Sequence, residues 1–160
     1  MRWTGALALG LMLVGCHSQA GPDKRQPAEV RYLPPGLDGV ALGMSYADFQ
    51  AVRPKAGAPQ DGIYDFRLTV VENAPGGSLA AVIYYFDEDL PGQPLYEVIA
   101  ESPEGVDVPA LAQQRLGPPN SGGEWVFTGD APWPIKAWVF QQKVVVAASM
   151  PGTEWDPAQP

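Results

Sequence analysis

The sequence predicts an α+β fold of two tandem repeats, each a short helix followed by a three-stranded antiparallel meander, with the helices packed on one sheet face. Three observations lead to this prediction. The 160-residue chain holds 18 glycines and 18 prolines, which argues against a helical bundle and favours short strands joined by turns. Several segments are apolar or alternate apolar and polar residues with the period of a strand. The helical and strand-like segments follow the same order in both halves.

The first helix is predicted over residues 46–53. Ser45 is a suitable N-cap, and Asp48, three residues later, completes an acidic version of the capping box. Pro54 then ends the helix because it cannot continue the backbone hydrogen-bond pattern. The side chains expected to face inward are Phe49 and Val52.

Three strands are predicted after this helix, over residues 63–72, 79–86 and 95–100. In the first of them, residues 64–70 alternate apolar and polar side chains, as in a strand with one buried face. The loop at 73–77 contains a Pro-Gly-Gly turn, and the acidic run Asp87-Glu88-Asp89 breaks the second strand.

The second half repeats this order. A helix is predicted over 108–116, capped by Asp107 and with Leu111 and Leu116 facing inward, and a Gly/Pro-rich loop follows it. Strands are predicted over 125–127, 135–141 and 144–148. Because residues 141–143 make a poor turn, the last two could instead form one bent strand.

Short motifs recur at matching places in the two halves. Gly57-Ala58-Pro59 precedes the aromatic segment Tyr64-Asp65-Phe66, and Gly117-Pro118-Pro119 precedes Trp125-Val126-Phe127. With Leu42-Gly43-Met44-Ser45 before the first helix, residues 39–149 resemble β-lactamase-inhibitor-protein-like domains and the accessory lipoproteins of the outer-membrane β-barrel assembly machine. The resemblance implies one small sheet per repeat, with a helix on one face and the other face free for a partner. Pro54 departs from the family pattern.

The N-terminus has the sequence pattern of an export signal. Arg2 precedes an uncharged apolar run over residues 3–14, which is too short to span a bilayer but suits a secretory signal. The run ends in Leu13-Val14-Gly15-Cys16, which resembles the lipobox of bacterial lipoproteins. The resemblance implies cleavage before Cys16, acylation of its thiol with fatty acids such as palmitate and, since His17 stands where aspartate signals inner-membrane retention, the periplasmic face of the outer membrane. The alternative is an ordinary cleaved signal with an incidental free thiol.

These boundaries divide the chain into a signal peptide (1–15), a lipidated flexible tether (16–36), a globular domain (37–150) and a tail (151–160). The two repeats occupy about 39–101 and 107–149 of the domain. Removing the signal leaves nine basic residues against 18 acidic ones, a net charge near −9 with His neutral. So acidic a domain is unsuited to nucleic acid and to anionic lipid, so membrane contact is expected through the lipid on Cys16.

Catalytic groups are scarce in the sequence. The only histidine, His17, lies in the tether, and Cys16 is the only thiol, which argues against hydrolytic triads, thiolate catalysis and Cys/His zinc sites. Asp87-Glu88-Asp89 could bind Ca²⁺, but adjacent side chains diverge, and a solvated turn is the simpler interpretation. No enzyme activity, metal or cofactor is expected, although a carboxylate pair in space is invisible in a sequence.

The aromatic residues suggest contacts with a partner. Trp133 lies between two prolines, Trp155 lies in the tail, and Tyr64 and Tyr85 belong to predicted strands. Each could contact another envelope protein or simply pack over the sheet. The sequence therefore predicts a membrane-anchored envelope lipoprotein that acts as a non-enzymatic protein-binding module. The alternatives are a carboxylate enzyme acting on an envelope glycan and a small-ligand carrier.

Overall fold

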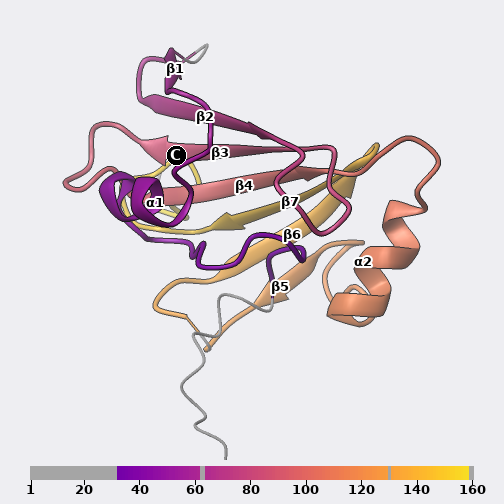
Figure 1. Ribbon diagram of the computed structural model, residues 1–160. Coiled ribbons are helices and arrows are strands. Elements are labelled where there is room, and N and C mark those ends of the chain that lie inside the picture. The colour runs from indigo at the N-terminus through magenta and orange to yellow at the C-terminus, as the bar shows by residue number, and fades with distance from the viewer. Residues whose placement is uncertain (1–31, 62–63, 130, 159–160) are drawn as a thin grey trace, which may run out of the picture.

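The structure is a computed structural model that describes residues 32–61, 64–129 and 131–158 (Figure 1). This part of the chain forms two helices, α1 (Tyr46–Val52) and α2 (Val108–Leu116), and one antiparallel sheet. The strands are β1 (Gln60–Asp61), β2 (Arg67–Asn73), β3 (Ala81–Asp87), β4 (Leu95–Glu101), β5 (Trp125–Phe127), β6 (Ile135–Phe140) and β7 (Lys143–Ala148). The expected signal peptide, Cys16 and the tether up to residue 31 lie outside the described residues.

The prediction of two helix-plus-meander repeats is wrong, because all seven strands form one continuous sheet in the order β1-β2-β3-β4-β7-β6-β5. The two predicted halves are joined where β4 pairs with β7, from Glu97 opposite Ala147 to Glu101 opposite Lys143. A separate three-stranded meander would leave the free backbone groups of β4 at a sheet edge. Pairing β4 with β7 satisfies those groups and buries both strands in the middle of the sheet.

The predicted N-cap, end and buried residue Phe49 of α1 are confirmed, but the predicted inward position of Val52 is wrong. The Ser45 hydroxyl accepts a hydrogen bond from the Asp48 backbone N–H at 3.1 Å, and the helix stops at Val52, two residues before Pro54. Phe49 is buried as expected. Val52 is 43% exposed, because it lies over Gly39 in the preceding loop instead of reaching the sheet.

The second helix keeps its predicted bounds but turns a different face inward. Asp107 accepts from the Ala110 backbone N–H at 3.0 Å, as an N-cap should. Val108 and Ala112, one helical turn apart, are buried and form the packed stripe. Leu111 lies off that stripe and is 47% exposed, so its predicted inward position is wrong.

The first predicted strand starts later than expected, whereas the two strands predicted at the end of the domain are confirmed. β2 begins only at Arg67, whose N–H donates to the carbonyl of Tyr64 in a turn. β6 and β7 are two strands rather than one bent strand, since Phe140 pairs with Lys143 across a two-residue turn. Gln141 occupies the left-handed region there, with φ 54°, which closes the hairpin despite the lack of glycine.

The core lies on one face of the sheet, here called the inner face. Phe49 of α1 packs on Tyr84 and Phe86 of β3, with ring centroids 4.6 and 5.1 Å apart. Figure 1 shows α1 in front of the middle strands and α2 at the opposite end of the sheet. Tyr32 packs on Phe127 at 4.3 Å and is fully buried, so the chain is already part of the core within the segment assigned to the tether.

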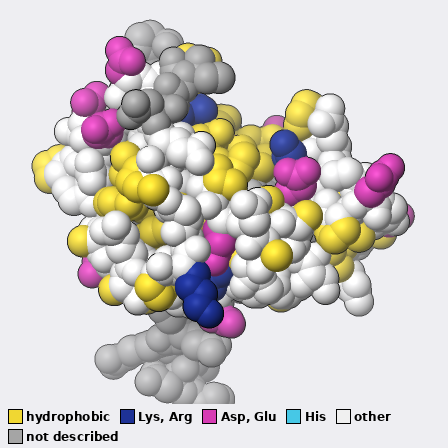
Figure 2. Space-filling view, turned by 45° about the horizontal axis from the view of Figure 1, so that its top comes forward, with side chains coloured by type: hydrophobic (Ala, Val, Ile, Leu, Met, Phe, Trp, Pro, Cys, Tyr) yellow, Lys and Arg dark blue, Asp and Glu magenta, His cyan; other side chains and the backbone are white. Residues whose placement is uncertain are grey.

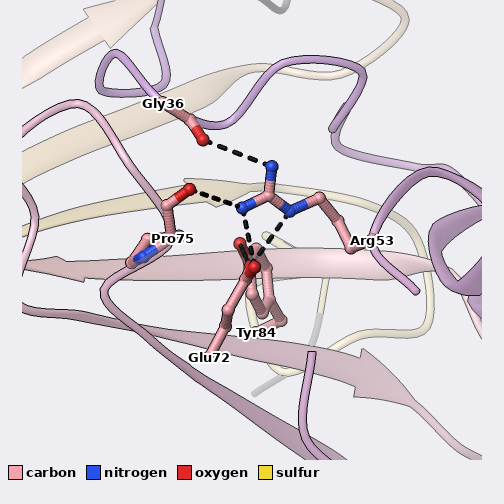
Figure 3. Close-up of polar contacts among 5 residues, drawn as sticks. All are labelled: Gly36, Arg53, Glu72, Pro75 and Tyr84. Atoms are coloured by element: carbon pink, nitrogen blue, oxygen red, sulfur yellow. Dashed lines mark hydrogen bonds and ion pairs between the residues drawn. The ribbon is translucent and has the colours of Figure 1, made fainter. Parts of the chain in front are cut away.

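A buried ion pair fixes the end of α1 to the sheet. Arg53, the C-cap of α1, donates from Nε and Nη2 to the Glu72 carboxylate on β2, at 3.0 and 2.8 Å. Its guanidinium also donates to the carbonyls of Gly36 and Pro75, at 3.3 and 3.2 Å (Figure 3). The Tyr84 hydroxyl donates to Glu72 at 2.9 Å. These contacts satisfy the buried charges and join four segments of the chain.

Candidate functional site

The other face of the sheet, here called the outer face, carries a cluster around Arg67 at the start of β2. Its guanidinium carbon lies 4.5 Å from the ring centroid of Tyr85 on β3 and 4.9 Å from that of Tyr64. These distances allow cation–π attraction. Tyr64 is 51% exposed and stacks on Phe66, while Tyr85 is half-buried. The structure therefore brings together two of the aromatic residues that the sequence singled out.

Arg67 also holds the C-terminal tail against the sheet. Its guanidinium donates to both oxygens of the Glu154 carboxylate. Burial alone would lower the pKa of Arg67, but the hydrogen bond and charge of Glu154 outweigh it and raise that pKa. Arg67 therefore stays charged, and its side chain has one fixed orientation between the tyrosines and the tail.

Trp155, the third predicted aromatic contact, belongs to the same region. Its indole N–H donates to Oε2 of Glu97 on β4 at 2.7 Å, and its ring packs against Trp138 of β6 at 5.2 Å. Trp155 is half-buried by these contacts. We define the Arg67 cluster as Tyr64, Arg67, Tyr85, Glu97, Glu154 and Trp155.

Glu97 has unusual electrostatics for a strand residue. It is 5% exposed, and burial together with the nearby Glu154 carboxylate raises its pKa to about 7, against the lowering effects of Trp155 and Arg67. The Tyr96 hydroxyl beside it is buried and has no hydrogen-bond partner among the described residues. Glu97 can therefore change charge near neutral pH, but Trp155 lies against the carboxyl and encloses it.

An apolar row runs across the outer face beside the Arg67 cluster. Strand register places Ile83 opposite Val71 and Ile99, Ile99 opposite Val145, and Val145 opposite Trp138. We call these five residues the outer apolar row. Val145 is buried and the other four are half-buried, while Phe140 at the end of β6 is 58% exposed. Figure 2 shows that hydrophobic side chains gather into a patch in the upper middle of that view, with basic and acidic side chains at its border.

Trp133, the fourth predicted contact, lies elsewhere and serves packing. It is half-buried against the core, and a Cβ at Gly43 would lie only 2.5 Å from its Cη2 atom. The indole ring thus covers the glycine of the Leu42-Gly43-Met44 motif. Since Gly43 also has φ +84°, no other residue suits this position well.

Sequence reasoning missed Arg67, Glu97 and Glu154. A signal for Glu97 was present, because it is an acid in the interior of the otherwise apolar run Leu95–Ala100. Arg67 occupied an outward position of an alternating strand, where a basic residue is unremarkable. Glu154 offered no local signal, since its role depends on the tail crossing the sheet.

The described residues contain neither a metal-binding cluster nor a membrane-spanning helix. No group of three or more His, Cys, Asp or Glu side chains in 32–61, 64–129 and 131–158 is arranged to hold a metal ion, Asp87, Glu88 and Asp89 included. Neither α1 nor α2 has the length and apolar character to cross a bilayer, and the described chain contains no other helix that does. Compared with protein-family models, curated proteins and solved structures, the chain gives no match.

Proposed function

We propose that this protein is a lipid-anchored envelope protein that binds another protein through the outer face of its sheet. The anchor is assigned to Cys16 by the apolar run and the Leu13-Val14-Gly15-Cys16 motif. The location is the periplasmic face of the outer membrane, on the evidence of His17. No chemistry is assigned to the domain in this role.

The outer apolar row is the observation that carries the binding role. An antiparallel sheet with one solvated face normally alternates apolar inward positions with polar outward ones. Here the outward positions of adjacent strands are apolar at Val71, Ile83 and Ile99, and these side chains are half-buried and not fully covered. Single exposed apolar side chains are common, but a contiguous set of them marks an interaction surface.

The Arg67 cluster supplies the polar border of this surface. Tyr, Trp and Arg are the residues that contribute most to protein interfaces, because they combine large contact area with hydrogen-bonding groups. Tyr64 and Arg67 stand beside the row, and Glu101 and Lys143 form an ion pair on its other side at 3.9 Å. An apolar centre with a charged and aromatic border is the general composition of a protein interface.

Site-specific photo-crosslinking in living cells tests the binding role. A benzoylphenylalanine placed at Ile83 should give a discrete adduct with one partner after irradiation. The same probe at Val52, which is exposed on a helix over the inner face, serves as the matched control. No adduct from Ile83, or the same adduct from both positions, would overturn the proposal.

The anchor has a separate test. Cells grown with radiolabelled palmitate should label the full-length protein, and Cys16→Ser should abolish the label and release the domain from washed membranes. Equal labelling of the variant would show that Cys16 is not the acceptor.

A carboxylate enzyme acting on an envelope glycan is a second candidate, favoured by Glu97 and Glu154 lying together with the pKa of Glu97 near 7. Glycosidases use two acids about 5–10 Å apart, one of them protonated at neutral pH. The enclosure of Glu97 by Trp155 argues against access by a sugar. Release of reducing ends from purified envelope glycan by the wild type, lost in Glu97→Gln, would establish it.

A further inference from the structure

A groove lies between α2 and the segment 32–35, on the inner side of the domain. Its volume is about 220 Å³. One wall is formed by Leu111, Ala112 and Leu116 of α2, and the other by Tyr32 and Pro34, with Val144 of β7 at the base. We call this the α2 groove. It lies away from the outer apolar row, which is on the opposite face of the sheet.

The walls of the α2 groove are almost entirely carbon. Leu111 is the large hydrophobic residue of α2 that is exposed, and it leaves its apolar surface open to the groove. Arg115 extends across one end and donates a hydrogen bond to the backbone carbonyl of Leu33, which holds the opposite wall in place. A peptide in the groove would bring backbone N–H and C=O groups that need partners, whereas a hydrocarbon chain brings none.

The α2 groove lies within reach of the proposed lipid anchor at Cys16. Tyr32, the first described residue, is itself part of the wall, and Cys16 precedes it by 16 residues. A segment of that length reaches at most about 50 Å when extended, so a group attached to Cys16 can return to the groove. Attachment also gives the group a high effective concentration there, which a free ligand would lack.

We propose that the α2 groove binds one fatty-acyl chain of the protein's own lipid anchor at Cys16. The proposal rests on the acylation of Cys16 given above. The groove is smaller than the 300–1,000 Å³ typical of pockets for drug-sized ligands, which suits part of a single linear chain rather than a bulky molecule. Occupation would withdraw one chain from the bilayer, weaken the anchor and hold the domain close to the membrane surface.

Photoaffinity labelling of the full-length protein tests this. Cells are fed a palmitate analogue with a diazirine near its methyl end, and the purified acylated protein is irradiated and mapped by mass spectrometry. The expected adducts lie on α2 and on residues 32–35. Leu111→Gln should reduce them at least several-fold, while Val52→Gln, which changes a helix residue of similar exposure, should leave them unchanged.

Three other outcomes would count against the proposal. Label on Cys16 with adducts scattered over the surface would overturn the groove while leaving the anchor intact. Absence of label from Cys16 would overturn the anchor itself. When the labelled protein is mixed with an isotopically heavy copy that carries no diazirine, groove adducts should stay on the light protein. Equal adducts on the heavy copy would assign the groove to exchangeable lipid instead of the attached chain.

Discussion

Trp155 donates its indole N–H to the Glu97 carboxylate at 2.7 Å, and this bond joins the C-terminal tail to the middle of the sheet. The tail thereby covers one part of the outer face and leaves the outer apolar row beside it open. The Trp155 ring also packs on Trp138, and the neighbouring tail residue Glu154 accepts from Arg67.

Trp155→Phe should destabilise the domain by about 1–3 kcal/mol, because it leaves a buried carboxylate without its donor while keeping an aromatic ring against Trp138. It should also raise the pKa of Glu97 further, since the indole hydrogen bond lowers that pKa in the wild type. Urea unfolding measures the first effect and an NMR titration of the Glu97 carboxyl the second. An unchanged titration would contradict the assigned contact.

The stability of the wild type should fall as the pH rises from about 4.5 to about 7. The pKa of Glu97 is raised from 4.5 to about 7 on folding, so in this range the folded state binds a proton that the unfolded state has released. A shift of this size corresponds to about 3 kcal/mol. Glu97→Gln keeps an acceptor for Trp155 but does not titrate, so its unfolding free energy should be flatter across the same pH range. Identical pH dependence in the two proteins would refute this assignment.

Arg53→Met should cost about 3–5 kcal/mol, because it leaves the buried Glu72 carboxylate without its ion-pair partner. Tyr84→Phe removes only one donor to the same carboxylate and should cost about 1 kcal/mol. The double variant Arg53→Met/Glu72→Leu should recover part of the loss, since no unpaired charge remains. Chemical denaturation of the wild type, the single variants Arg53→Met and Glu72→Leu, and their double variant gives the coupling between the two residues. If the losses from the two single variants simply added in the double variant, the buried pair would be contradicted.

Gly43→Ala should destabilise the domain by about 3 kcal/mol, partly through its φ of +84° and partly through the 2.5 Å approach of the new Cβ to Trp133. Trp133→Leu in the same chain should remove the second part and leave the first. A double-mutant cycle by thermal or urea unfolding should therefore give a coupling of about 1 kcal/mol or more. Independent effects at the two positions would mean that the ring does not cover the glycine.

The sequence by itself determined the local elements. Capping residues Ser45 and Asp107, the stop before Pro54 and the alternating or continuous apolar runs placed both helices and most strands within a few residues of their observed bounds. These signals work because each depends on hydrogen bonds and side-chain periods within a few residues of one another. The acyl anchor at Cys16 is likewise inferred from a short local motif.

Only the tertiary structure decided how those elements combine. The pairing of β4 with β7 joins residues more than 40 positions apart, and it turned two expected repeats into one sheet. The same holds for Glu154 on Arg67 and Trp155 on Glu97, where the tail meets strands from the middle of the chain. Such contacts form between strand edges and sheet faces that are still unpaired after the local elements have formed. They join residues far apart in the chain, so no short sequence motif indicates them.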